Sequence, residues 1–272
     1  RLQVALDDEI TGLGVRRDDA VTRERRTLRA RYQLVDAASG RVLHRAGVCG
    51  QRFSPCSTFK IPLGLMGFDA GILRDAHHPA WDYRPAVHEA SRPEEKRRTD
   101  PTSWESNSVI WFSREITRRL GTARFQAYVD RFGYGNRDLA GDPGKGNGLT
   151  DAWLMSSLAI SPDEQVAFLR RLLAGRGMAR PSAHALTQAI LPRFDGSGGW
   201  RVQGKTGSAT LRGADGRSDP RQPLGWFVGW ADKGARRVVF ARFGAGPEMP
   251  QNKAGGPAMR DALLAEIRRL AG

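Results

Sequence analysis

The stretch SPCSTFKIPLGLMGF, residues 54–68, runs from a turn-like Ser-Pro-Cys segment into an apolar sequence of helical character. It predicts a helix from Ser57 to about Gly71, in which Pro62 is tolerated because it falls near the first turn. Ser57 and Lys60 are three residues apart and therefore share one helix face. A serine hydroxyl becomes a nucleophile when a base removes its proton, and a lysine can be that base only when burial lowers its pKa. By itself, the S-x-x-K pattern more often marks an ordinary helix start with an exposed lysine. The assignment of Ser57 as nucleophile and Lys60 as base therefore depends on further motifs.

A second motif, Lys205-Thr206-Gly207, follows far downstream, where a predicted strand leads to a turn. S-x-x-K followed by K-T-G is the signature pair of penicillin-recognising serine enzymes. Between them lie, in order, Ser108-Val109-Ile110 and Tyr134-Gly135-Asn136. In this combination the chain resembles the class D β-lactamases, the oxacillinases. The resemblance runs roughly from Tyr32 to the C-terminus and includes residues 146–149, 152–154 and 225–230.

The resemblance implies a mixed α/β (α+β) fold of the β-lactamase and transpeptidase type. In it, an antiparallel sheet is flanked by terminal helices, an all-helical subdomain is inserted, and the active site lies in the cleft between the two parts. The residues themselves predict a single catalytic domain, 1–272, with a sheet part at about 29–56 and 180–272 and a helical part at about 57–179. Residues 1–28 are an N-terminal extension whose role stays open. The predicted strands are 32–35, 42–45, 202–206, 226–231 and 238–243, and the further helices are 108–120, 162–174 and 257–270.

The resemblance also implies the catalytic roles of five residues. Ser57 attacks the β-lactam carbonyl and becomes acylated. Lys60 carries a carbamate, formed from its neutral amine and carbon dioxide, and acts as the general base; no other cofactor is expected. Trp153 donates its indole N–H to this carbamate, Ser108 passes a proton to the lactam nitrogen, and Lys205 supplies positive potential near the substrate carboxylate.

The same resemblance gives the substrate-binding residues: Ile110, Thr206, Gly207, Ser208 and Arg260. Thr206 and Arg260 would bind the substrate carboxylate, and the backbone N–H groups of Ser57 and Ser208 would form the oxyanion hole. Ile110 stands where valine is usual, so an added methylene is expected next to the carbamate.

Several of these residues also have structural interpretations. Ser108 would be a helix N-cap, Trp153 a core residue, Arg260 an exposed helical arginine, and Tyr134-Gly135-Asn136 a turn. The small residues Ser208-Ala209-Thr210 replace a bulky aromatic that is common after K-T-G in this family. They predict broad activity on penicillins and oximino-cephalosporins with weak carbapenem turnover.

Composition limits the partners. The net charge is +14, but the arginines are scattered without aromatic interleaving, so no nucleic-acid binding is expected. The runs Arg23-Glu24-Arg25-Arg26 and Glu95-Lys96-Arg97-Arg98 are predicted to be solvated, the second within a surface loop from Ser91 to Asp100. The sequence contains no apolar run of about 18 residues, so no membrane span is expected. The N-terminal residues Arg1-Leu2-Gln3 lack the initiator Met and the apolar stretch of a signal peptide, as in a processed, exported protein or a trimmed sequence. We expect an exported, periplasmic protein of a Gram-negative bacterium, monomeric or homodimeric, acting on a small-molecule β-lactam.

The cysteines and histidines add little chemistry. Cys49 and Cys56 are seven residues apart and are either bridged or free, with Cys56 a small buried neighbour of Ser57. The five histidines have no metal-ligand spacing, so no metal is expected.

Two other functions use similar motifs. The sensor domain of a penicillin receptor is acylated and stays acylated, and a D-alanyl-D-alanine peptidase acts on a cell-wall peptide. The peptidases usually have asparagine at the position of Ile110, and a receptor needs a membrane anchor. Single-turnover against multiple-turnover kinetics distinguishes these functions.

Overall fold

The computed structural model describes residues 31–175, 177–213 and 217–272. The predicted extension 1–28, with the run Arg23-Glu24-Arg25-Arg26, lies outside the described residues. The described chain forms a sheet in the order β2-β1-β6-β5-β4-β3, in which all neighbours pair antiparallel. The strands are β1 (Arg31–Asp36), β2 (Val42–Ala46), β3 (Arg193–Gly196), β4 (Trp200–Arg212), β5 (Ser218–Lys233) and β6 (Arg236–Ala245).

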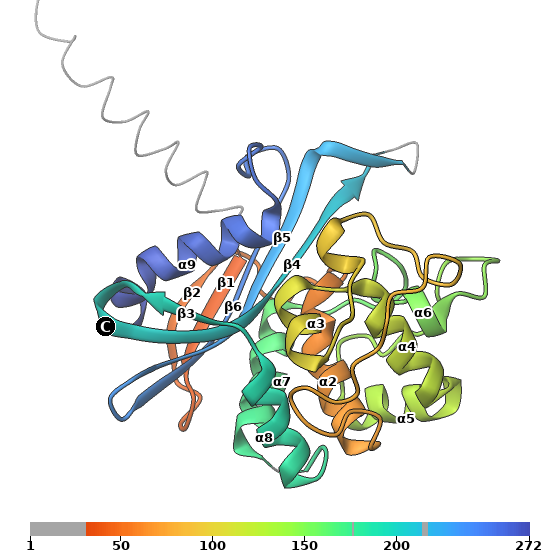
Figure 1. Cartoon of the computed structure of the whole chain (residues 1–272). Helices are drawn as coiled ribbons and strands as arrows, with labels where there is room; N and C mark the ends of the chain where they lie inside the picture. Colours follow the sequence, from red (N-terminus) through yellow and green to blue (C-terminus); the bar gives the residue numbers. More distant parts are fainter. Residues whose placement is uncertain (1–30, 176, 214–216) are drawn as a thin grey trace, which may run out of the picture.

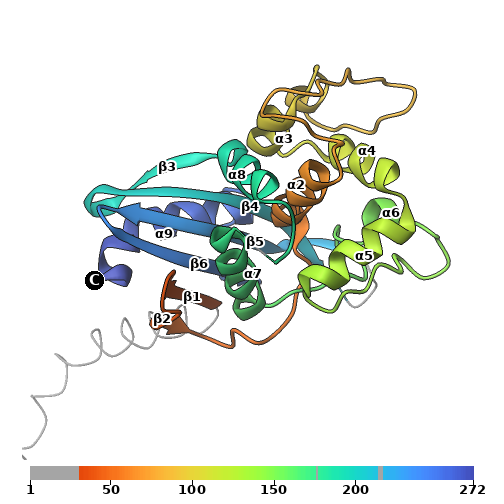
Figure 2. The same cartoon turned by 90° about the horizontal axis from the view of Figure 1, so that it is seen from below.

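The helices fall on two sides of this sheet (Figure 1). The C-terminal helix α9 (Gly255–Ala271) packs on β3, β4, β5 and β6. Helix α7 (Pro162–Ala174) contacts β1, β5 and β6, and Figure 2 shows it lying across the sheet. The remaining helices are α2 (Lys60–Asp69), α3 (Pro101–Asn107), α4 (Ile110–Leu120), α5 (Thr122–Phe132), α6 (Gly148–Asp151) and α8 (Pro181–Ile190).

The side-chain alternation of the strands builds two cores. Successive side chains of a strand point to opposite faces. In β5, Trp226, Val228 and Trp230 belong to the core that the sheet shares with the helical side. Phe227 and Ala231 belong to the core beneath α9. The sheet is therefore buried on both faces, and its β4 strand lies between α9 and the helical side.

The mixed fold and every predicted helix and strand are confirmed, with shifts of several residues at some ends. The predicted helix from Ser57 begins as a 3₁₀ turn, η1 (Cys56–Phe59), and continues as α2. The capping box of Ser161 and Glu164 that begins α7 is present. Sequence reasoning missed α3, α5, α6, α8 and the short strand β3. The predicted helical part ended at about residue 179. Helix α8 follows that point, so the helices extend into the part of the chain that was predicted to belong to the sheet.

The segment from Ser91 to Asp100 is the largely exposed surface loop that its polarity predicted, except that Glu95 and Thr99 are buried. It contains the 3₁₀ turn η2 (Pro93–Glu95), and Glu95 is only 4% exposed. The Glu95 carboxylate accepts hydrogen bonds from the Arg92 side chain and from two backbone N–H groups. Its backbone carbonyl accepts from the indole N–H of Trp111 at 2.6 Å. A charged residue can be buried when it is paired and hydrogen-bonded in this way.

Candidate active site

Ser57 and Lys60 lie together at the junction of η1 and α2. The Lys60 side chain is 1% exposed, and its Nζ donates a hydrogen bond to Ser57 Oγ at 3.4 Å. The backbone before them is fixed, because Cys56 N donates to the Trp153 carbonyl at 3.0 Å and Cys56 has φ +50°. Burial lowers the pKa of Lys60 to about 7, with the positive charge of Lys205 acting in the same direction. The amine is therefore available as a base near neutral pH.

Lys205 and Ser108 form the second pair of the site. The side chain of Lys205, on β4, is 2% exposed, and its Nζ donates to Ser108 Oγ at 3.1 Å and to the Thr206 carbonyl at 3.2 Å. Burial lowers the pKa of Lys205 to about 8. Ser108 is the C-cap of α3, with φ +57°, and Val109 is the N-cap of α4, so the N-cap interpretation of Ser108 is wrong. The left-handed backbone turns Ser108 out of both helices, and Ile110 begins α4 two residues later.

Strand β4 approaches η1 so closely that only glycine fits at one position. A Cβ on Gly207 would lie 2.9 Å from the Pro55 carbonyl oxygen and 3.2 Å from Thr58 Cγ2. Real Cβ contacts shorter than 3.0 Å are essentially absent. Gly207 therefore sets the separation between the strand that carries Lys205 and the turn that carries Ser57.

The first turn of α9 lies against the other face of β4. Gly256 N donates to Ser208 Oγ at 2.9 Å, and a Cβ on Gly256 would come within 2.9 Å of Thr206 Cβ. Thr206 and Ser208 thus share the face of β4 that meets α9. Ser208, Ala209 and Thr210 also line a cavity of about 320 Å³, together with residues 250, 251 and 253–255 and two prolines of β5.

Arg260 lies one turn further along α9. Its guanidinium donates to Asp261 Oδ1 at 3.0 and 2.9 Å and lies over the Phe194 ring, 5.2 Å from its centroid. These contacts hold it toward the β3 edge of the sheet, and none of its hydrogen bonds within the described residues reaches Thr206.

Trp153 packs beside the helix that carries Lys60. Its ring, 1% exposed, stacks on Phe59 with centroids 5.4 Å apart, and its carbonyl also accepts from Ser54 Oγ at 2.8 Å. Both the core interpretation and a position next to Lys60 are therefore compatible with the fold.

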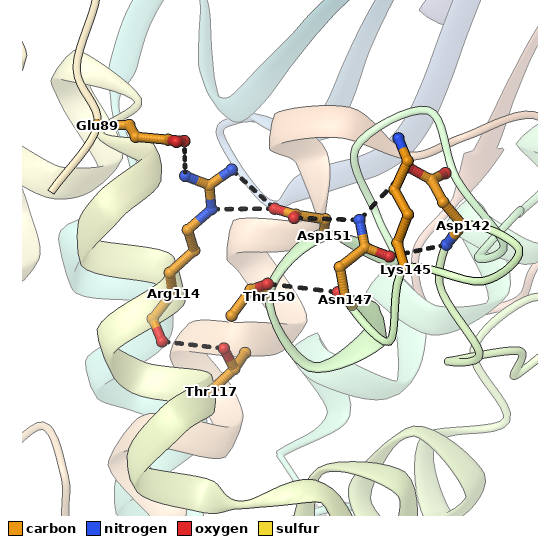
Figure 3. A network of polar contacts seen from close by, with 8 residues as sticks. All are labelled: Glu89, Arg114, Thr117, Asp142, Lys145, Asn147, Thr150 and Asp151. Carbon is orange, nitrogen blue, oxygen red and sulfur yellow. Dashed lines mark hydrogen bonds and ion pairs between the residues drawn. The ribbon is translucent and has the colours of Figure 1, made fainter. Parts of the chain in front are cut away.

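A polar network fixes the segment that leads into Trp153 (Figure 3). Arg114 of α4 donates to Asp151 at 2.8 and 3.0 Å and to Glu89 at 2.8 Å. Asn147 donates to Asp151 at 3.3 Å and to Asp142 at 3.4 Å. Since Asp151 ends α6 two residues before Trp153, this network connects α4 to the position of the indole.

Tyr134-Gly135-Asn136 is hydrogen-bonded to the segment that contains Ser157 and Ala159. Asn136 Nδ2 donates to the Ser157 carbonyl at 2.8 Å, and Asn136 Oδ1 accepts from Ala159 N at 2.9 Å. Gly135 has φ +56°, and a Cβ there would lie 2.0 Å from the Ala159 carbonyl oxygen. The motif thus has the geometry of the structural turn.

One ionisable residue of the site was missed by sequence reasoning. Glu105, on α3, is 0% exposed, and burial raises its pKa to about 7 while Lys205 and Lys60 act in the opposite direction. Its position three residues before Ser108 was the only available signal, and nothing in the sequence shows that this helix face is turned inward.

Cys49 and Cys56 are free and buried rather than bridged. Burial raises the pKa of Cys56 to about 12, so it is a thiol beside Ser57. Within residues 31–175, 177–213 and 217–272, no group of three or more histidine, cysteine or acidic side chains could hold a metal ion. No helix in the described part of the chain combines the length and apolar composition needed to cross a membrane.

Comparison with known proteins agrees with this geometry. The family model of the penicillin-binding protein transpeptidase domain matches residues 21–267. β-Lactamase OXA-9 of Klebsiella pneumoniae is 45% identical over 239 residues, which are 88% of this chain and 87% of that protein. β-Lactamase OXA-1 of Escherichia coli is 36% identical over 195 residues, 71% of this chain and 66% of that protein. The crystal structure of the class D β-lactamase OXA-427 has a TM-score of 0.79 and 41% identity, and covers 89% of this chain and 99% of that one.

The chain belongs to the penicillin-binding transpeptidase-domain family and, within it, to the class D serine β-lactamases.

Proposed function

We propose that this enzyme hydrolyses β-lactam antibiotics through an acyl intermediate on Ser57 and thereby confers resistance. The observation that carries the proposal is the hydrogen bond from the buried Lys60 Nζ to the partly exposed Ser57 Oγ, at 3.4 Å. A hydroxyl next to an amine whose pKa is about 7 can lose its proton at neutral pH. Ser57 then attacks the lactam carbonyl, and the ring C–N bond breaks as the nitrogen takes up a proton.

Lys60 also fits the carbamate that the family resemblance implies. Its side chain is buried and its amine has a lowered pKa, and the preceding residue, Phe59, stacks on Trp153. A neutral amine is the form that reacts with carbon dioxide, and an apolar pocket disfavours the ammonium. A carbamate on Lys60 would supply a general base for acylation and for the hydrolytic water. Trp153 would hold it through its indole N–H.

Ser108 and Lys205 would protonate the leaving nitrogen. Lys205 Nζ donates to Ser108 Oγ, so the Ser108 proton is free to move toward the substrate and can be replaced from Lys205. The positive charge of Lys205 and the Thr206 hydroxyl attract the substrate carboxylate. Arg260 would also bind the substrate carboxylate if its guanidinium left Asp261 and paired with the substrate instead. The N–H groups of Ser57 and Ser208 would stabilise the tetrahedral oxyanion.

Ser57→Ala tests the assignment. The variant should fold like the wild type and lose about a thousandfold or more in the turnover of a chromogenic cephalosporin, because the covalent route is absent. Ser39→Ala, in the turn between β1 and β2, is the matched control and should keep full activity. Multiple turnovers by the wild type support a lactamase, whereas a stable acyl-enzyme after one turnover would indicate a penicillin sensor.

Activity should also depend on pH and bicarbonate. The Lys60 amine is protonated as pH falls below its pKa of about 7, so turnover should decline in acid. Bicarbonate should restore the activity of carbon dioxide-depleted enzyme. Full activity of depleted enzyme at acidic pH would contradict the base role of Lys60.

We also propose that the enzyme acts in the periplasm of a Gram-negative bacterium. Expression with an export signal should raise resistance to penicillins, whereas the same protein retained in the cytoplasm should not. Equal resistance in both strains would contradict this location.

A further inference from the structure

Helix α7 and the Tyr134-Gly135-Asn136 motif meet on the buried side of the nucleophile turn η1, in a contact that the proposed mechanism does not use. The Tyr134 ring packs edge-on against Phe59 of η1 and Phe168 of α7, with centroids 5.4 and 5.3 Å apart. Thr58 of η1 and Gln165 of α7 are 0% and 1% exposed, and both oppose the rise in the pKa of Tyr134 that burial causes. Three buried polar side chains therefore lie together beneath the turn that carries the nucleophile.

Gln165 is hydrogen-bonded to this turn. Its Nε2 donates to Thr58 Oγ1 at 3.0 Å. Thr58 Oγ1 in turn donates to the Pro55 carbonyl at 2.7 Å, and Thr58 N donates to the same oxygen at 3.1 Å. A hydroxyl that donates to one partner and accepts from another has its orientation fixed. Hydrogen bonds thus connect α7 to the residue two positions before Ser57.

The groups held by these hydrogen bonds are the ones that face β4. A Cβ on Gly207 would lie 2.9 Å from the Pro55 carbonyl oxygen and 3.2 Å from Thr58 Cγ2. In the proposed mechanism, the N–H groups of Ser57 on the turn and Ser208 on β4 bind one oxyanion. Their separation therefore depends on how Pro55 and Thr58 pack against Gly207.

Helix α7 is a firm support for the Gln165 hydrogen bond. It begins at a capping box, in which Ser161 N donates to Glu164 Oε2 at 2.9 Å, and it packs on β1, β5 and β6. Gln165 N donates to the Ser161 carbonyl at 2.9 Å, which places Gln165 in the first turn. Burial of an amide is unfavourable unless it is hydrogen-bonded, and leucine would fill such a position without this requirement. The amide at this position is explained if its bond to Thr58 has a function.

We propose that Gln165 is a positioning residue of the active site, which fixes the nucleophile turn against β4 through Thr58 and so sets the place of Ser57. The inference rests on the proposed acyl mechanism. Without the Gln165 amide, the Thr58 hydroxyl can rotate and the turn can shift relative to β4. A misplacement of about 1 Å can lower a rate about a hundredfold. We therefore expect slower acylation of Ser57 with unchanged affinity for the substrate.

The test measures the acylation step by stopped-flow with a chromogenic cephalosporin, fitting the rate constant of acylation and the dissociation constant of the substrate separately. Gln165→Leu removes the amide and keeps a buried side chain of similar size. Gln165→Met also lacks the amide, has a more adaptable side chain, and takes its place if the leucine variant does not fold. Either variant should acylate about ten- to a hundredfold more slowly than the wild type, with the same dissociation constant.

Two substitutions of Thr58 show whether Gln165 acts through its hydroxyl. Thr58→Val should slow acylation as Gln165→Leu does, and the double variant should be no slower than the slower single variant, because the two side chains act as a unit. Thr58→Ser keeps the hydroxyl and should retain most of the rate. Thr187→Val on α8 is the matched control, since the Thr187 hydroxyl also donates to a backbone carbonyl, that of Ala183, at 2.7 Å and the residue is 0% exposed. It should lower stability in urea without slowing acylation.

Three results would overturn the inference. Wild-type acylation rates in the folded Gln165 variants would show that the amide does not position the turn. Additive losses in the double variant would show that Gln165 does not act through Thr58. Equal slowing in Thr187→Val would attribute the effect to lost stability alone. Failure of the proposed function is distinguishable from all three, because the wild type itself would then form no acyl adduct on Ser57 in mass spectrometry.

Discussion

Gly207→Ala tests whether the close approach of β4 to η1 positions the active site. The new methyl would lie 2.9 Å from the Pro55 carbonyl oxygen, 3.2 Å from Thr58 Cγ2 and 3.4 Å from Cys56 Cβ. The Pro55 oxygen cannot easily give way, because it already accepts from Thr58 N at 3.1 Å and from Thr58 Oγ1 at 2.7 Å. The strand and the turn must therefore move apart.

We expect Gly207→Ala to lose both stability and catalytic activity. Overpacking of this kind costs about 1–3 kcal/mol of unfolding free energy. Separation of Lys205 on β4 from Ser57 on η1 should cost more in catalysis, since a misplacement of about 1 Å can lower the rate about a hundredfold. Urea denaturation and the kcat/KM for a chromogenic cephalosporin measure the two losses separately.

Gly64→Ala is the matched control within α2. Its Cβ would make ordinary contacts of 3.7–3.8 Å with Thr187, Trp104 and Ile190. Alanine in a helix interior is favoured over glycine by roughly 0.5–1 kcal/mol, so this variant should be at least as stable as the wild type. The reasoning is refuted if Gly207→Ala keeps wild-type stability and activity, or if both variants lose activity equally.

Three further substitutions, the last of them with a control, have defined outcomes. Trp153→Phe keeps a ring to stack on Phe59 but removes the indole N–H, so activity should need added bicarbonate and the acyl-enzyme should accumulate in stopped-flow traces; an unchanged bicarbonate dependence would contradict this. Ser208→Phe should lower kcat/KM for an oximino-cephalosporin about 10–200-fold more than for benzylpenicillin, whereas equal losses would show that this residue does not set the range. Asp151→Asn should lower the unfolding free energy by about 1 kcal/mol through its partly buried bonds to Arg114, while Asp82→Asn, at an exposed ion pair, should change it little in the same denaturation assay.

Local sequence patterns were sufficient for most of the fold. The strand predicted at 226–231 and the helix predicted at 162–174 are both present, and the helix begins at the capping box of Ser161 and Glu164. Helix α3 was missed because its residues, PTSWESN, are largely polar, and reasoning from polarity does not find a short helix of this composition. The same reasoning failed for Glu95, which is buried because Arg92 and backbone N–H groups satisfy its charge.

The sequence by itself determined which reactive groups this protein has and that Ser57 and Lys60 share one helix face, because three-residue spacing has a fixed geometry in a helix. Their chemistry depends on contacts between distant segments, which no spacing encodes. Burial lowers the pKa of Lys60, the turn between α3 and α4 brings Ser108 to Lys205, and α9 holds Arg260 toward Phe194. Only the tertiary structure decided that Glu105 lies with the two lysines, because the cost of burying a charge depends on everything packed around it.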